Sequence, residues 1–459
     1  MKVLIVSPEI APFTQISELS YYLSSLSQGF IENEIDLYVM IPGYKNLYES
    51  CANLIENKIK LAEFKINSGY QDRLFKLNEL KTRQNYKLLT LDSDDFFNRD
   101  GYYGIYNNYF IDNGLRFGSF CRASVESLNY INDGFDRIFA FDWQTGLIPV
   151  YLKTLEDVNK DNIPYISFVA FNLCNQGLFS KYLVPELEFD WKIFNYRELE
   201  FWGQMSFIKG GLVFSDKIII PLGSSLSEII EEHMSFGLED LLQFREDNVS
   251  WIKPGSKDHI TISIEDKHET KMKLLENMPF SENSLPLIFL NIYKETASYP
   301  IVADFIKEAL LKYDCNWILY PAIDITQDME LYKIWKDFPH KMKIITGGKN
   351  ISEYYKSSDF FLFLPQIKYP NLDFMRALKY RCLIIGGHST GISKIYRDLG
   401  LSVSQVNSLH IKKLELETML KTLHSSLILY NSNGFSEIFE KASKFKRSFK
   451  NVAKEYLKK

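Results

Sequence analysis

Cysteine and histidine are scarce in this chain of 459 residues. Its five cysteines include no C-x-x-C pair, so neither a disulfide framework nor a cysteine zinc site is predicted. Seven histidines are present, and none of them precedes His233. The first half of the chain therefore has no imidazole to offer to a site. We predict no metal ion and no cofactor.

Long apolar runs and an excess of positive charge are missing as well. No stretch approaches the roughly 20 apolar residues that are needed to span a bilayer. The apolar start, residues 3–6, is too short for a signal peptide, because a Ser-Pro-Glu tripeptide follows it at once. A formal net charge of -5 argues against a surface that binds nucleic acid. These absences predict a cytoplasmic protein without a membrane or nucleic-acid partner.

Short apolar runs alternate with longer amphipathic stretches, which is typical of parallel strands joined by helices. The runs are nearly continuous in apolar residues, so the predicted sheets are buried on both faces. A polar segment, residues 253–285, separates two sets of runs and predicts a domain boundary. The expected strands are residues 3–7, 35–41, 86–92, 137–142, 165–171 and 217–222 in the first set, and 287–293, 316–322, 343–347, 360–365 and 382–387 in the second.

Six segments resemble, in the same order, the motifs of bacterial glycogen synthases and plant starch synthases. They are KVLIVSPEIAPF (2–13), DNGLRFGSFCRAS (112–124), FAFDWQTGLIPVYLK (139–153), FNLCNQG (171–177), MSFIKGGLVFSDKI (205–218) and SDFFLFLP (358–365). The resemblance implies an α/β protein of the GT-B fold, in which two Rossmann-like doubly wound parallel-sheet domains face a cleft. We predict domains at 1–255 and 256–434. A terminal helix, 435–459, is expected to pack back on the first domain.

The resemblance also implies an α-glucan or a nucleotide sugar as ligand, yet residues of the family's first-domain site are replaced. The family's K-T-G-G-L motif, whose Lys meets the ligand, corresponds here to QISEL (15–19), so Gln15 stands at the charged position. Ser17 is a predicted N-cap of the helix that follows, and Glu18 a first-turn acid. The histidines of H-x-H-D-W-H and I-H-N correspond to Phe139, Phe141, Gln144 and Phe171. A phenylalanine can neither donate a hydrogen bond nor carry charge.

Replacements are predicted in the second domain too. Tyr293 and Ser298 stand where the family has the Arg and Lys that neutralise the diphosphate, although Lys294 lies one residue away. Lys368 stands where the family has the Glu beside the donor sugar. Seven residues in or near the motifs are candidates for ligand binding in the cleft: Asp142, Asn172, Gln176, Lys209, Lys294, Lys368 and His388.

Removing one preorganised electrostatic group typically lowers turnover by about 10²–10³. Several such losses predict a catalytically degenerate relative of the glycogen and starch synthases, with no confident catalytic residue. Such a protein would act by binding glucan or an enzyme of glycogen metabolism. The alternative is an active but divergent glycosyltransferase, which transfers glucose from ADP-glucose or another nucleotide sugar to an α-1,4-glucan.

Overall fold

The computed structural model describes fourteen stretches of the chain that together form two compact units. Unit 1 comprises Met1–Pro221, Ser235–Ile252 and Phe449–Lys459, and unit 2 comprises Leu222–Met234 and Lys253–Ser448. The described residues are 1–105, 108–131, 134–155, 163–221, 225–231, 235–253, 255, 262–292, 300–321, 329–345, 351–364, 372–387, 392–443 and 447–458.

Unit 1 is built on a nine-stranded sheet in the order β14-β13-β9-β8-β1-β2-β5-β4-β3. The seven strands from β14 to β5 are parallel, and a long hairpin, β3–β4, joins them antiparallel at one edge. The parallel part has the doubly wound order of a Rossmann-like sheet. The strands are β1 (Lys2–Val6), β2 (Asp36–Pro42), β3 (Ile55–Ser68), β4 (Gln71–Thr82), β5 (Lys87–Asp92), β8 (Arg137–Phe141), β9 (Tyr165–Val169), β13 (Lys217–Ile220) and β14 (Val249–Trp251).

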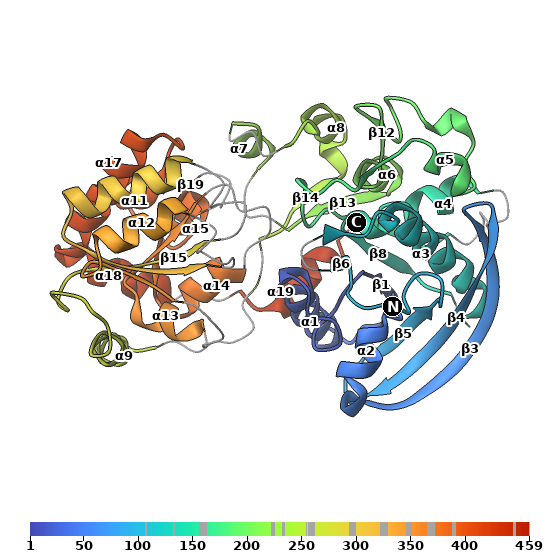
Figure 1. Cartoon of the computed structure of the whole chain (residues 1–459), viewed down its shortest axis with the longest axis horizontal. Coiled ribbons are helices and arrows are strands. Elements are labelled where there is room, and N and C mark those ends of the chain that lie inside the picture. Colours follow the sequence, from blue (N-terminus) through green and yellow to red (C-terminus); the bar gives the residue numbers. More distant parts are fainter. Residues whose placement is uncertain are drawn as a thin grey trace. The chain divides into compact units, whose positions relative to one another are not determined.

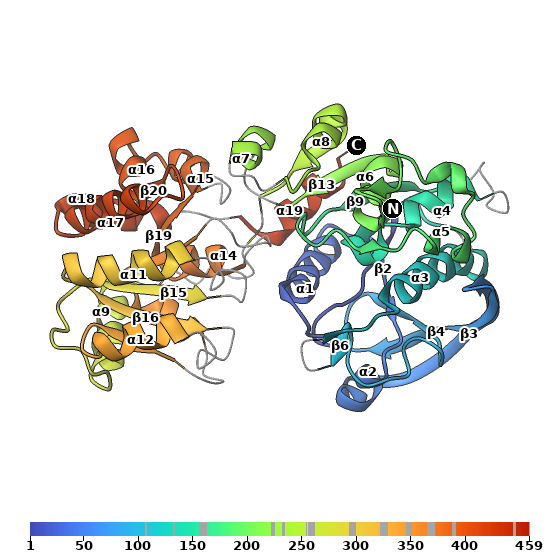
Figure 2. The ribbon, with the colours of Figure 1, turned by 45° about the horizontal axis from the view of Figure 1, so that its top comes forward.

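Helices cover both faces of this sheet. On one face α1 (Glu18–Ile31) lies beside α19 (Phe449–Tyr456), as both views show (Figure 1 and Figure 2). The other face carries α3 (Asn113–Ser127), α4 (Ile148–Thr154) and α6 (Phe207–Phe214). Smaller elements complete the unit: α2 (Lys45–Ser50), α5 (Leu183–Glu186), α8 (Glu239–Phe244), β6 (Gly104–Ile105), β7 (Asn108–Tyr109), β10 (Leu178–Phe179), β11 (Glu200–Phe201) and β12 (Gln204–Ser206).

Unit 2 contains a second Rossmann-like sheet, parallel throughout, in the order β17-β16-β15-β18-β19-β20. Figure 1 shows helices on both faces, with α11 and α12 on one and α13 and α14 on the other. The elements are β15 (Leu287–Ile292), β16 (Asn316–Pro321), β17 (Met342–Ile344), β18 (Phe360–Phe363), β19 (Leu383–Gly387), β20 (His410–Ile411), α7 (Leu226–Glu231), α9 (Ile264–Leu275), α11 (Pro300–Lys312), α12 (Met329–Asp337), α13 (Ser352–Ser357), α14 (Leu372–Lys379), α15 (Ile392–Asp398), α16 (Val403–Leu409), α17 (Leu416–Tyr430) and α18 (Asn433–Ser443).

All eleven strands expected from the sequence are present, but the single terminal helix expected from residue 435 is wrong. Two helices occupy that region, and Arg447 and Ser448 between them are not helical. α18 belongs to unit 2, whereas α19 belongs to unit 1 and packs on α1. The units also differ from the predicted ranges at α7, which belongs to unit 2. The predicted boundary at residue 255 stays a prediction.

Two buried lysines of α9 hold this helix against other elements of unit 2. The Lys267 ammonium donates to the carbonyls of Tyr355, Lys356 and Tyr380, at the C-terminal ends of α13 and α14. A cation at that end satisfies carbonyls that the helix leaves without a partner. One turn later, the Lys271 Nζ lies 2.6 Å from the Asp359 carboxylate in a pair that is almost completely buried. The polar stretch that predicted a boundary thus supplies packing for the second sheet.

The buried pair gives a test of this packing. We expect Lys271→Met to lower the free energy of unfolding by about 3–5 kcal/mol, because the Asp359 charge would remain buried without its partner. Urea unfolding followed by circular dichroism measures the change. Lys273→Met in the same helix removes only an exposed pair with Glu269 and should leave the midpoint unchanged. Equal midpoints for the two variants would contradict the assignment.

Candidate functional site

The candidate site of unit 1 lies beyond the carboxyl ends of β1, β8 and β9, where doubly wound sheets bind ligands. The segment after β1 leads into α1, whose N-cap is Ser17, as predicted. The Ser17 side chain accepts a hydrogen bond from the Leu19 amide. The side chain of Gln15, at the position of the family's lysine, donates to the Pro12 carbonyl and accepts from the Tyr21 hydroxyl. Gln15 is therefore held by local contacts on the surface.

A buried carboxylate of the chain itself occupies the backbone donors before α1. Glu9 is 1% exposed, and its Oε2 accepts from the amides of Ile16 and Ser17 at 3.1 and 2.8 Å. Its Oε1 accepts from the hydroxyls of Ser17 and Tyr103. Burial raises the pKa of the Glu9 carboxyl, although these hydrogen bonds act against the shift. An anionic ligand at these two amides would have to displace Glu9.

Asp142, which follows β8, adopts a backbone conformation that is rare for a residue with a side chain. Its φ of 62° and ψ of 178° fall in a region used almost only by glycine and cost about 1–3 kcal/mol. The Asp142 amide donates to the Val169 carbonyl, and its own carbonyl accepts from the Thr145 amide, so the neighbouring backbone holds the strain in place. Burial raises the pKa of Asp142 to about 8, with a smaller contribution from the Glu9 charge.

The positions that correspond to the family's histidines form an aromatic cluster with α1 and α19. The ring of Phe171 lies 5.3 Å from that of Tyr22 at an interplanar angle of 61°, and the ring of Phe141 stacks on Tyr456. Phe139 contacts Phe30 and Tyr456. At the centre, the hydroxyl oxygens of Tyr22 and Tyr456 lie 2.7 Å apart. We call the seven buried residues the aromatic cluster: Tyr22, Phe30, Phe139, Phe141, Phe171, Phe449 and Tyr456.

Several residues kept from the family motifs have structural contacts in unit 1. The Lys209 ammonium donates to the carbonyls of Tyr196 and Glu200, and burial lowers the pKa of its side chain. Asn172 Oδ1 accepts from the Cys174 amide, and Gln176 Nε2 donates to the Phe236 carbonyl. The binding roles predicted for Asp142, Asn172, Gln176 and Lys209 stay predictions.

The backbone conformation and close packing at Gly177 require a glycine at this position of the motif. Its φ is +57°, and a Cβ atom added there would lie 2.6 Å from the Trp143 ring, too close for any side chain. The kept Trp143 and Gly177 are therefore packed against each other. Gly210 is similarly enclosed, because a Cβ atom would lie 2.9 Å from side chains of Leu199 and Val150.

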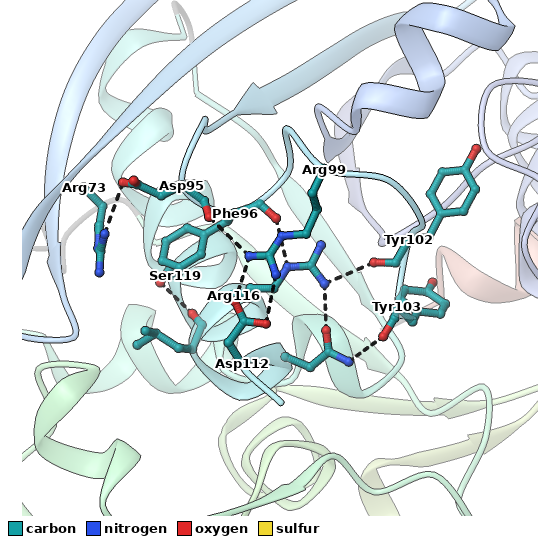
Figure 3. A network of polar contacts seen from close by, with 11 residues as sticks. Arg73, Asp95, Phe96, Arg99, Tyr102, Tyr103, Asp112, Arg116 and Ser119 are labelled. Carbon is teal, nitrogen blue, oxygen red and sulfur yellow. Dashed lines mark hydrogen bonds and ion pairs between the residues drawn. The ribbon is translucent and has the colours of Figure 1, made fainter. Parts of the chain in front are cut away.

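A buried arginine near this edge was not among the predicted site residues. Arg116 of α3 donates to the carbonyls of Phe96 and Tyr102 and to the Asn113 side chain, while its Nη2 has no hydrogen-bond partner among the described residues. Figure 3 shows this network beside the Arg99–Asp112 ion pair. Burial lowers the pKa of Arg116 to about 10. Both Glu9 and Arg116 stand in the motifs at 2–13 and 112–124, which was the available signal.

The predicted site residues of the second domain cannot be assigned contacts as those of unit 1 can. Tyr293, Lys294, Ser298, Lys368 and His388 all lie outside the described residues. Among the described residues of unit 2, Asp373 in the first turn of α14 is fully buried and accepts from Asn291 and Arg376. Within the described ranges no group of three or more His, Cys, Asp or Glu side chains is arranged to hold a metal ion. No helix in those ranges is long and apolar enough to span a membrane.

Comparison with solved structures defines the class. The fold is similar to the catalytic domain of starch synthase IV from Arabidopsis thaliana, solved with ADP and acarbose, with a TM-score of 0.78, 17% identity, and coverage of 99% of this chain and 97% of the other. A glycosyltransferase from Rickettsia africae matches with a TM-score of 0.52, 11% identity, and coverage of 99% and 96%. The chain thus has the GT-B fold, with two Rossmann-like units.

Sequence comparisons identify the family within that class. The model of the starch synthase catalytic domain matches residues 2–244. A glycogen synthase of Thermodesulfovibrio yellowstonii is 25% identical over 492 aligned positions, which cover 100% of this chain and 97% of the relative. One of Hydrogenobaculum is 30% identical over 246 positions, which cover 53% of this chain and 48% of the relative. The chain belongs to the glycogen and starch synthase family, as its motifs predicted.

The raised pKa of Asp142 predicts a pH dependence of stability. The folded state binds a proton that the unfolded state releases near pH 4, so this contribution is present below about pH 4 and is lost as the pH rises towards 8. Relative to Asp142→Asn, the wild type should lose up to about 1.4 kcal/mol of stability per pH unit in that window. Chemical unfolding of both proteins at several pH values measures this. A constant difference would contradict the prediction.

The aromatic cluster predicts the effect of restoring the family's histidine. Phe171→His should lower the free energy of unfolding by about 1–3 kcal/mol, because a polar ring would enter a packed apolar site. Thermal unfolding at pH 8, where the imidazole is neutral, separates packing from charge. Phe171→Leu keeps the site apolar and should cost less than about 1.5 kcal/mol. If the histidine variant proves as stable as the wild type, the cluster does not have the packing role assigned to it.

Proposed function

We propose that this member of the glycogen and starch synthase family has lost glucosyl transfer and acts by binding α-glucan. The observation that carries the proposal is the aromatic cluster. Phe139, Phe141 and Phe171 stand at positions where the family has histidine, and each is at most 2% exposed. Their rings contact α1 and α19, so these side chains are engaged in packing and offer no donor to a sugar.

The electrostatics of unit 1 support the same proposal. Transfer from a nucleotide sugar needs positive charge and backbone donors where the diphosphate leaves. Before α1, Gln15 stands where the resemblance places the family's lysine. The amides of Ile16 and Ser17 donate to Glu9. Gln15 brings no positive charge to a diphosphate at this point.

The glucan part of the proposal rests on family membership and on the kept framework. The relatives are named glycogen synthases, and the similar starch synthase IV domain was solved with acarbose, an oligosaccharide analogue. Lys209, Gly177 and Gly210 maintain the backbone of the kept motifs through contacts that need no catalysis. A chain with this framework could retain glucan recognition after the groups around the leaving diphosphate were replaced.

Two measurements on the full-length protein test the proposal separately. Incubation with glycogen and radiolabelled ADP-glucose or UDP-glucose should give no incorporation above a protein-free blank, while an active glycogen synthase in parallel gives label. Co-sedimentation with glycogen should carry the protein into the pellet. Incorporation proportional to protein concentration would overturn the catalytic part, and failure to sediment would overturn the glucan part.

A further inference from the structure

A short segment of unit 1, residues 195–203, carries two large aromatic rings that face solvent. Tyr196 is 70% exposed and Trp202 is 77% exposed. We call this segment the aromatic loop. It runs from the turn at Asn195 through β11 to the tip of the β11–β12 hairpin. Single exposed rings are common on protein surfaces, so exposure alone does not mark a site.

Trp202 occupies a turn position that disfavours bulky residues. Trp202 and Gly203 form a two-residue turn between paired strands, with φ values of 50° and 76°. Such turns prefer Asn, Asp or Gly. Tyr70, 68% exposed with a φ of 58°, occupies a similar turn of the β3–β4 hairpin. The turn alone therefore does not mark a site.

Rigid support distinguishes the aromatic loop. The Trp202 ring stacks on Phe201 with centroids 4.6 Å apart and an interplanar angle of 28°, and Phe201 is buried. The Gly203 amide donates to the Glu200 carboxylate at 2.7 Å. One side of the indole is thus packed against the protein, while most of the side chain remains open to solvent. A ring held in this way loses little freedom when a ligand binds.

Lys209 supports the backbone of the aromatic loop at two points. Its ammonium donates to the carbonyls of Tyr196, which carries one exposed ring, and of Glu200, two positions before Trp202. Arg197 donates to the Tyr196 hydroxyl, and its guanidinium lies 5.5 Å from the centre of that ring. Asn195 Oδ1 accepts from the Arg197 amide. Lys209, which is kept from the family motif, thus has a structural role that does not require a nucleotide sugar.

We propose that Trp202 and Tyr196 form a stacking platform for the glucose units of an α-glucan chain, an inference that rests on the glucan-binding role proposed above. A glucose ring has C–H groups on its faces and hydroxyls around its rim. The C–H groups pack against the negative face of an aromatic ring, and the hydroxyls require polar neighbours. Exposed Arg197 and Gln204 stand beside the two rings and supply donors and acceptors.

The polar neighbours also favour a glucan over a protein partner. A stable protein interface buries about 800 Å² on each side and has an apolar core depleted of charge. The exposed residues between and beside the two rings are instead charged or polar, namely Arg197 and Gln204, with Gly203 at the turn. Two rings that are each flanked by hydrogen-bonding groups suit single sugar units.

Native gel electrophoresis of the full-length protein, with and without glycogen in the gel, tests the platform. Trp202→Ala should raise the dissociation constant for glycogen by about tenfold, the effect expected of an anchoring aromatic residue. Tyr196→Ala should also weaken binding, and Trp202→Phe should keep most of it. Tyr70→Ala is the matched control, because it removes an equally exposed ring from a similar turn, and it should bind as the wild type does.

Maltoheptaose, followed by tryptophan fluorescence, gives a second readout on the same proteins, and thermal unfolding verifies that each variant is folded. If the wild type binds neither glycogen nor maltoheptaose, the proposed glucan-binding function itself fails. If the wild type binds and both alanine variants bind equally well, the function stands and the platform is wrong. Weaker retention of a co-purifying protein by Trp202→Ala, with unchanged glycogen binding, would likewise overturn the platform in favour of a protein interface.

Discussion

The packing of α19 against α1 is centred on a buried contact between two tyrosine hydroxyls. Tyr22 and Tyr456 are fully buried and are separated by 434 positions in the chain. A hydroxyl buried without a partner would cost about 1–3 kcal/mol, and each of these two supplies the partner for the other. Arg137 and Lys217 of the central sheet then donate to the carbonyls of Tyr456 and Lys458, which fixes the end of α19 on the sheet.

The same contact lies among three of the positions where the resemblance places histidine in the family. Phe139, Phe141 and Phe171 surround the two tyrosine rings, and aromatic pairs of this kind each contribute about 0.5–1.5 kcal/mol beyond the area that they bury. Imidazoles in the same places would need hydrogen-bond partners that a packed apolar cluster does not supply. Phe139 and Phe141 thus contact Tyr456 of the terminal helix directly, and Phe171 contacts Tyr22 of α1.

Several polar groups that remain in unit 1 are engaged by the protein itself, although Asp142 Oδ1, Gln176 Oε1 and Arg116 Nη2 have no hydrogen-bond partner among the described residues. Glu9 accepts the hydrogen bonds that an anionic ligand would need before α1, and Lys209 is engaged with carbonyls of the aromatic loop. Asp142 keeps its strained backbone because the adjacent strand and turn hold it, and burial favours its neutral form. In this arrangement the family's framework persists with its charges directed to internal contacts. By contrast, the rings of Tyr196 and Trp202 face solvent.

Both sheets were predictable from the sequence, because parallel strands that are buried on both faces consist of nearly continuous apolar residues. The family was predictable because its motifs occur in the same order in this chain. The β3–β4 hairpin was missed, since much of β3 is exposed and the buried residues of both strands are interrupted by exposed or half-buried ones, which leaves no long apolar run. The phenylalanines at the positions that the resemblance assigns to histidine were also visible in the sequence, and the replacement itself stays a prediction. Their contacts with Tyr22 and Tyr456 were not, because these depend on a helix from the far end of the chain. Local pattern determines elements and motifs, whereas contacts between distant segments exist only once the chain has folded.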